Sequence, residues 1–98
     1  MSCEDKPRED YINKKHMVQI LLDLHISEEI ISELPYEKDT LKTLFAIKEQ
    51  EIFKKHKVTE ELYRSSYSHY FFNPQELDQI YQVLIDSLSV YQQTRRNE

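Results

Sequence analysis

Apolar residues recur at helical spacing in four segments of this chain, which short polar or proline-containing stretches separate. The first segment predicts a helix from about residue 11 or 13 to residue 32 or 34, with two adjacent apolar stripes. The stripes consist of Met17, Ile20, Leu21 and Leu24, and of Val18, Leu22 and Ile26. Because both stripes together cover more than half of the circumference, we expect this helix to contact several neighbours and to be central in the fold.

His25 projects between these two stripes, which predicts that its imidazole is at least partly buried. Burial of a histidine requires hydrogen-bond partners and disfavours the charged form. A histidine of the core is one interpretation, and a ligand-binding histidine is the other, since Glu28 and Glu29 follow on the same side. The opposite, polar side of the helix carries His16, Gln19, Asp23 and Ser27.

Pro35 ends the first segment, because the residue before a proline is kept out of the α region. A second helix is predicted to start near Asp39 or Thr40. Its apolar face consists of Leu41, Leu44, Phe45 and Ile52. Lysines gather in its last turn, where cations complement the helix dipole, and His56 among them is interpreted as a surface residue.

The third helix is predicted over residues 60–71, after a Thr59 cap. Tyr63, Tyr67 and Tyr70 lie within one arc of it. An aromatic stripe at this spacing is typical of a core, but each phenol hydroxyl needs water or a partner. We therefore expect the edge of the arc to reach the surface, where it is the first candidate for a binding patch.

The stretch from Phe72 to Leu77 marks the start of a fourth helix. Asn73 is predicted as the N-cap, Pro74 as the first helical residue, Glu76 as its capping-box partner, and Phe72 as a staple on Leu77. One apolar stripe follows, made of Leu77, Ile80, Tyr81, Leu84, Leu88 and Tyr91. The helix is expected to end near residue 91 or 93, which leaves residues 94–98 loose.

These elements predict an all-α, compact four-helix domain over residues 11–93, because the connections between helices are short. The charged residues 1–10 are predicted to form a flexible tether. A length of 98 residues fits one domain, and the absence of glycine favours helices over strands. A formal charge of −5 disfavours nucleic-acid binding.

Several kinds of chemistry lack their motifs in this sequence. Without glycine there is no phosphate-binding loop or serine nucleophile elbow, and no Glu-x-x-His or Cys-x-x-Cys motif occurs. Cys3 is the single cysteine, so an internal disulfide is excluded, and no base is positioned beside it. No apolar run approaches the ~18–20 residues that span a bilayer. We therefore expect a protein that is not an enzyme and that holds no cofactor or metal.

Two stretches together resemble a family of small lipoproteins of Bacteroidota that contain a domain of unknown function. The first stretch is residues 17–25, Met-Val-Gln-Ile-Leu-Leu-Asp-Leu-His. The second begins with residues 52–62, Ile-Phe-Lys-Lys-His-Lys-Val-Thr-Glu-Glu-Leu, and continues through Ser66, Tyr70, Asn73-Pro-Gln-Glu-Leu77 and Ile80-Tyr81. Family members often have glycine where this chain has Lys57, and glycine closes a helix in a left-handed conformation at little cost.

The resemblance implies that Cys3 is the lipid-bearing residue of the mature protein, followed by a charged tether. It implies Asp23, His25, Tyr70 and Asn73 as signature residues without a known role. Our leading hypothesis is a lipid-anchored, non-enzymatic protein of the cell envelope, facing the periplasm or the cell exterior, that binds another envelope protein. Two alternatives remain: a periplasmic domain that binds a small ligand or a metal near His25, and a cytoplasmic helical adaptor.

Overall fold

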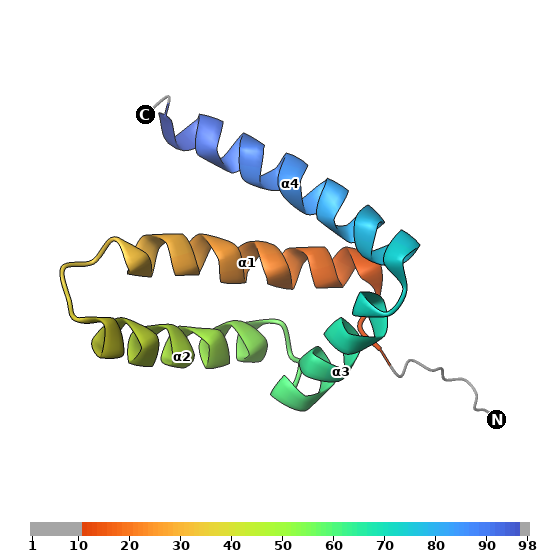
Figure 1. The fold of residues 1–98 in the computed structure, drawn as a ribbon, viewed down its shortest axis with the longest axis horizontal. Coiled ribbons are helices and arrows are strands. Elements are labelled where there is room, and N and C mark those ends of the chain that lie inside the picture. The colour runs from red at the N-terminus through yellow and green to blue at the C-terminus, as the bar shows by residue number, and fades with distance from the viewer. Residues whose placement is uncertain (1–10, 97–98) are drawn as a thin grey trace.

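The computed structural model describes residues 11–96, which form four helices and no strand (Figure 1). The helices are α1 (Lys14–Ser32), α2 (Lys38–Lys55), α3 (Glu60–Phe71) and α4 (Pro74–Arg96). The predicted all-α four-helix domain is thus confirmed. The predicted tether, residues 1–10, lies outside the described residues and includes Cys3. Residues 94–96, predicted to be loose, belong to α4.

Helix α1 lies between α2 and α4, and α3 lies at one end of the molecule, where it connects α2 to α4 (Figure 1). The turn between α1 and α2 lies at the opposite end (Figure 1). The described part of the chain is elongated, with extents of 53 × 28 × 24 Å. The prediction that the first helix is central is therefore confirmed.

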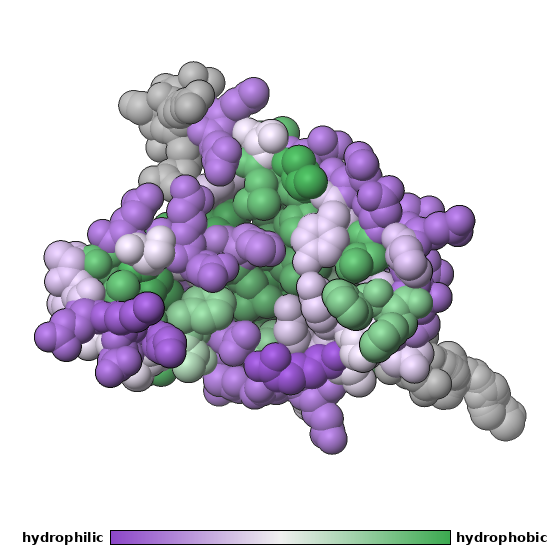
Figure 2. All heavy atoms as spheres, in the orientation of Figure 1, coloured by the Kyte–Doolittle hydropathy of each residue, from purple (hydrophilic) through white to green (hydrophobic). Residues whose placement is uncertain are grey.

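The core forms where the apolar stripes of all four helices meet. Met17 and Ile20 of α1 and Ile80 and Leu84 of α4 are almost completely buried. The other buried apolar residues are Ile12, Val18, Leu21, Leu24, Ile52, Phe53, Tyr63 and Tyr70. Figure 2 shows apolar side chains reaching the surface between α1 and α4, with hydrophilic side chains along the outer edges. Removal of this apolar area from water is the main force that holds the helices together.

Side chains cap two of the helices, and the sequence predicts the second of these caps, Thr59. The Asn13 Oδ1 atom accepts a hydrogen bond of 2.8 Å from the amide of His16, and Thr59 Oγ1 accepts one of 3.0 Å from the amide of Leu62. Helix α2 starts earlier than predicted, because Glu37 takes the cap position without a side-chain bond to the helix. The side chains of Asn13 and Thr59 each satisfy an amide that would otherwise lack a partner at a helix start.

Lys57 ends α2 in a left-handed conformation, with φ of 59°. The amide of Lys57 donates to the carbonyl of Lys54 at 3.1 Å, and the amide of Val58 donates to the carbonyl of Phe53 at 3.0 Å. These two bonds define a Schellman motif. Lys57 therefore adopts the backbone conformation that glycine occupies most easily, and a β-carbon makes this conformation strained.

Asn73 is the cap residue of α4, but its side chain does not act as predicted. Its carbonyl accepts from the amide of Leu77 at 2.9 Å, while its Nδ2 donates to the carbonyl of His69 at 2.6 Å. The side chain thus binds the end of α3 rather than the start of α4. Glu76 faces the His69 ring, with Oε1 3.8 Å from Nε2, instead of turning back to Asn73. Phe72 is 75% exposed, so the predicted staple on Leu77 is wrong.

None of the helices within residues 11–96 is long and apolar enough to cross a membrane.

Candidate functional site

His56 lies at the C-terminal end of α2 and turns toward α1. Its Nε2 lies 2.7 Å from Oδ2 of Asp23, and its side chain is only 11% exposed. The interpretation of His56 as a surface residue is therefore wrong. The Schellman motif at Lys57 explains the difference, because it reverses the chain directly after His56 and leaves the imidazole against α1.

Asp23 receives two donors from α2 at the same oxygen. Besides His56, the Lys55 ammonium group lies 3.1 Å from Oδ2. Burial raises the pKa of the Asp23 carboxyl, but the hydrogen bonds from His56 and Lys55 outweigh burial and hold the pKa below its ordinary value. The polar side of α1 thus forms an interface with α2, and the contacts across it favour the ionised form of the Asp23 carboxyl.

His16 adds a second imidazole to this pair, about two helical turns before Asp23 on α1. Its Nε2 lies 3.2 Å from Nδ1 of His56, with ring centroids 5.2 Å apart. An ionised carboxylate only accepts hydrogen bonds, so His56 Nε2 is assigned as the donor to Asp23, which leaves Nδ1 as the acceptor. His16 Nε2 is therefore assigned as the donor to His56. We call His16, Asp23, Lys55 and His56 the histidine cluster.

A groove of about 370 Å³ opens beside the histidine cluster, between α1 and α2. Its lining combines the polar groups of Asp23, Ser27, Lys48, Glu51 and Lys55 with Ile26 and Ile52. Within residues 11–96 no group of three or more histidine, cysteine or carboxylate side chains is placed to hold a metal ion. In the Asp23–His56 pair a carboxylate orients an imidazole, as it does in many catalytic bases. The His56 nitrogen that would accept a proton from a substrate, Nδ1, faces His16.

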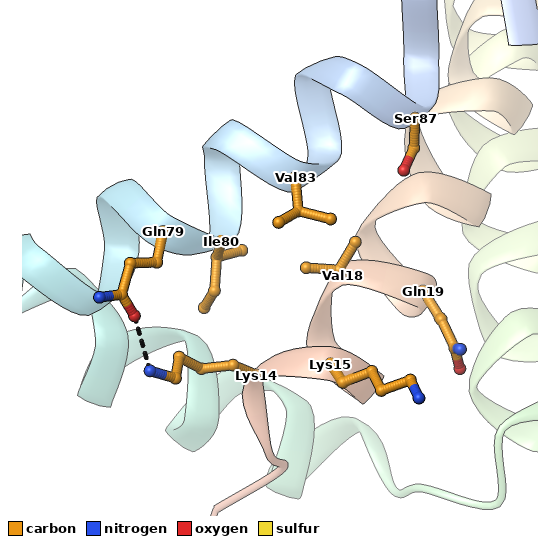
Figure 3. A pocket seen from close by; sticks show the side chains of 8 residues that line it. All are labelled: Lys14, Lys15, Val18, Gln19, Gln79, Ile80, Val83 and Ser87. Atoms are coloured by element: carbon orange, nitrogen blue, oxygen red, sulfur yellow. Dashed lines mark hydrogen bonds between the residues drawn. The ribbon is translucent and has the colours of Figure 1, made fainter. Parts of the chain in front are cut away.

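A second groove, of about 450 Å³, lies between α1 and α4 (Figure 3). Val18, Ile80 and Val83 form its apolar wall, and we call it the α1–α4 groove. The remaining lining residues are Lys14, Lys15, Gln19, Gln79 and Ser87. Lys14 Nζ bonds Gln79 Oε1 at 2.7 Å and so joins the two helices at one end (Figure 3).

His25 is not buried, which contradicts the expectation from the two apolar stripes. Its side chain is 43% exposed, and Nδ1 lies 4.0 Å from a carboxylate oxygen of Glu28. Among the described helices only α2 and α4 pack along α1, so the arc of α1 that faces neither helix stays open. The alternative of a small-ligand or metal site near His25 depended on a buried histidine, and this histidine is exposed.

The predicted tyrosine arc of α3 lies partly in the core. Tyr63 and Tyr70 are buried, and Tyr63 packs on Phe53 with ring centroids 4.9 Å apart. Burial, followed by the nearby Tyr67, raises the pKa of Tyr63 to about 12. Tyr67 is half-buried, and its hydroxyl lies 3.1 Å from the hydroxyl of Tyr81. Tyr63 and Tyr70 thus belong to the core, as an aromatic stripe indicates, and Tyr67 lies at its margin, where the arc reaches the surface. Partner binding at this edge stays a prediction.

Two hydroxyls of α3 instead bind the segment that precedes α1. Ser66 Oγ accepts a hydrogen bond of 2.8 Å from the amide of Ile12, and the Tyr70 hydroxyl donates one of 2.6 Å to the Ile12 carbonyl. Next to them, Tyr11 stacks on His69 with centroids 4.0 Å apart. We call the contacts of Ser66 and Tyr70 with Ile12 the Ile12 clamp. The sequence analysis did not predict it, although Ser66 and Tyr70 are polar groups one turn apart on the buried arc of α3.

The fold and these sites define a small all-helical domain with grooves between its helices and a clamp on the segment that precedes α1. The model of one family, described as a domain of unknown function (DUF4296), matches residues 8–94. The chain therefore belongs to this family. Searches for similar curated proteins and for similar solved structures both gave no match.

Proposed function

We propose that this protein is a lipid-anchored, non-enzymatic component of the cell envelope that binds another envelope protein through the α1–α4 groove. Cys3 is the attachment point in this proposal, as the resemblance to the lipoprotein family implies, and Glu4 and Asp5 after it begin the charged tether. Stable anchoring requires more than one acyl chain, as bacterial lipoproteins carry, because a single chain binds a bilayer only weakly.

The α1–α4 groove is the observation that carries the binding part of the proposal. Val83 is 52% exposed on its wall, next to Val18 and Ile80, which are buried. An apolar surface between two helices suits the apolar face of an amphipathic helix from a partner. Lys14 and Lys15 at the rim favour acidic residues on that partner helix, because complementary charges speed and orient association.

The Ile12 clamp supports a short path along the chain between this groove and the proposed anchor at Cys3. The two hydroxyls of α3 fix the chain only two positions before Lys14, where the groove begins. From Cys3 to Lys14 an extended chain spans at most about 40 Å. A lipid on Cys3 therefore keeps the groove within that distance of the membrane surface, so the proposed partner is a membrane protein or a protein held at the membrane.

Photo-cross-linking in the native host tests the binding part. A cross-linking amino acid replaces Val83 in one strain and Ile85 in another, because Ile85 is similarly exposed, at 58%, but does not line the groove. We expect one specific protein adduct from position 83, reduced by Lys14→Glu together with Lys15→Glu, and no such adduct from position 85. Equal labelling from both positions contradicts binding in the groove.

Membrane association is measured separately in the same strains. We expect the parent chain to follow the detergent phase on phase separation and the Cys3→Ser variant to move to the aqueous phase. Parent and variant in the same phase contradict lipid anchoring at Cys3. A cytoplasmic adaptor predicts aqueous behaviour for both proteins, and the coding sequence upstream of Met1 gives an independent check.

A further inference from the structure

We propose that His16 and His56 together bind a divalent late transition-metal ion of the Zn²⁺ type, with Asp23 as the carboxylate that orients His56. The two facing nitrogens, His16 Nε2 and His56 Nδ1, are 3.2 Å apart. Two imidazole nitrogens on a tetrahedral zinc ion, with Zn–N of about 2.0–2.1 Å, are separated by about 3.3–3.4 Å. The pair therefore already has the spacing of a two-histidine chelate.

The surroundings of His56 are those of a metal-binding histidine. Such histidines almost always donate their second ring N–H to a carboxylate or a carbonyl, which fixes the tautomer. Here His56 Nε2 lies 2.7 Å from Asp23 Oδ2, and this contact leaves Nδ1 as the nitrogen with a lone pair. Lys55 on the same carboxylate oxygen and the Schellman motif behind His56 hold the ring in place.

Metal binding requires one proton to change position. In the metal-free pair, His16 Nε2–H donates to His56 Nδ1, so the proton must leave Nε2 for the ring to bind a metal. It moves through solvent to Nδ1 of the half-buried His16, and both rings stay neutral without net proton release. Because the described residues offer no third histidine, cysteine or carboxylate ligand, water completes the coordination shell. Protons compete with a metal ion for imidazole nitrogens, so acidic solution weakens binding.

Calorimetric titration with ZnCl₂ at about pH 7.5 and about pH 5.5 tests this site. The protein is the full chain without an affinity tag and with Cys3→Ser, because a thiol is itself a zinc ligand. We expect one ion per chain at the higher pH and binding at least tenfold weaker at the lower pH. His16→Ala is expected to weaken binding at least tenfold, and Asp23→Asn about ten- to a hundredfold.

His25→Ala is the matched control, since His25 is an exposed histidine on the same helix, and this variant should bind zinc as the parent does. NMR of the imidazole protons gives a readout that does not depend on a variant: zinc should shift the signals of His16 and His56 but not those of His25 and His69. The proposal is overturned if the parent binds no stoichiometric zinc, if His16→Ala binds like the parent, or if zinc shifts all four histidines alike. Unchanged affinity in Asp23→Asn overturns the role of Asp23.

Discussion

The hydroxyl of Tyr70 donates a hydrogen bond of 2.6 Å to the carbonyl of Ile12, which lies 58 residues earlier in the chain. With Ser66, whose Oγ accepts from the Ile12 amide, it satisfies both backbone groups of one buried residue. Buried backbone groups without partners are costly, so these two side chains let the segment before α1 enter the core. The clamp thereby fixes where the N-terminal segment joins the domain.

Removal of the clamp should therefore destabilise the fold. Tyr70→Phe and Ser66→Ala each leave one buried backbone group of Ile12 unsatisfied, and each should lower the free energy of unfolding by about 1–3 kcal/mol. Ser65→Ala is the control, because Ser65 is exposed and bonds only the nearby carbonyl of Leu62. Urea denaturation measures all three variants. A loss below about 0.5 kcal/mol for both clamp variants, the usual range of surface changes, contradicts the assigned role.

Lys57→Gly should stabilise the protein. The left-handed backbone of Lys57 brings its β-carbon close to the following carbonyl, and relief of this contact is worth about 1 kcal/mol. In a domain of this size, that gain raises the thermal midpoint by about 4–8 °C. Lys57→Ala removes the charge but keeps the β-carbon, so its midpoint should stay near that of the parent. Equal thermal midpoints for the parent and both variants contradict backbone strain at Lys57.

Leu84→Ala should destabilise the domain by about 2–5 kcal/mol, because Leu84 is buried in the core on the α1 side of α4. Ile85→Ala, its neighbour on the exposed side, should change the free energy of unfolding by no more than about 0.5 kcal/mol. Chemical denaturation of the two variants compares the faces of one helix. Similar losses at both positions indicate that α4 is rotated relative to the described packing.

Asp23 should make the stability depend on pH in the acidic range. Its pKa in the folded state lies below the value in the unfolded chain, which is about 3.9. The ionised carboxylate therefore stabilises the fold above that pH, and this contribution is lost as the pH falls through the folded-state pKa. The gap in unfolding free energy between the parent and Asp23→Asn should shrink between about pH 6 and pH 2.5. A difference that does not change with pH contradicts stabilisation of the fold by the ionised Asp23 carboxylate.

Local signals in the sequence predicted most of the fold. Helix α3 begins after Thr59 and ends at Phe71 as predicted, because a hydroxyl cap and two first-turn carboxylates act within one turn of the helix. The buried face of α4 around Leu84 also follows from periodicity alone. These features depend on residues that are neighbours in the sequence.

The candidate sites depend on contacts between distant residues, which periodicity does not contain. A helical wheel shows that His25 lies between apolar stripes, but the number of neighbouring helices decides whether that arc is covered. The prediction for His56 was wrong because the contact of His56 with Asp23 follows from the left-handed turn at Lys57. The glycine that the family resemblance implies at the position of Lys57 was a signal for this turn. The clamp on Ile12 likewise joins α3 to a segment more than 50 residues away.

The mass of the N-terminal peptide from protein isolated from its native host tests lipid anchoring most directly. Lipid anchoring predicts a peptide whose first residue is Cys3 and whose mass includes covalently attached acyl chains. An unmodified peptide that contains Cys3, with Met1 and Ser2 still before it, contradicts the proposed anchor.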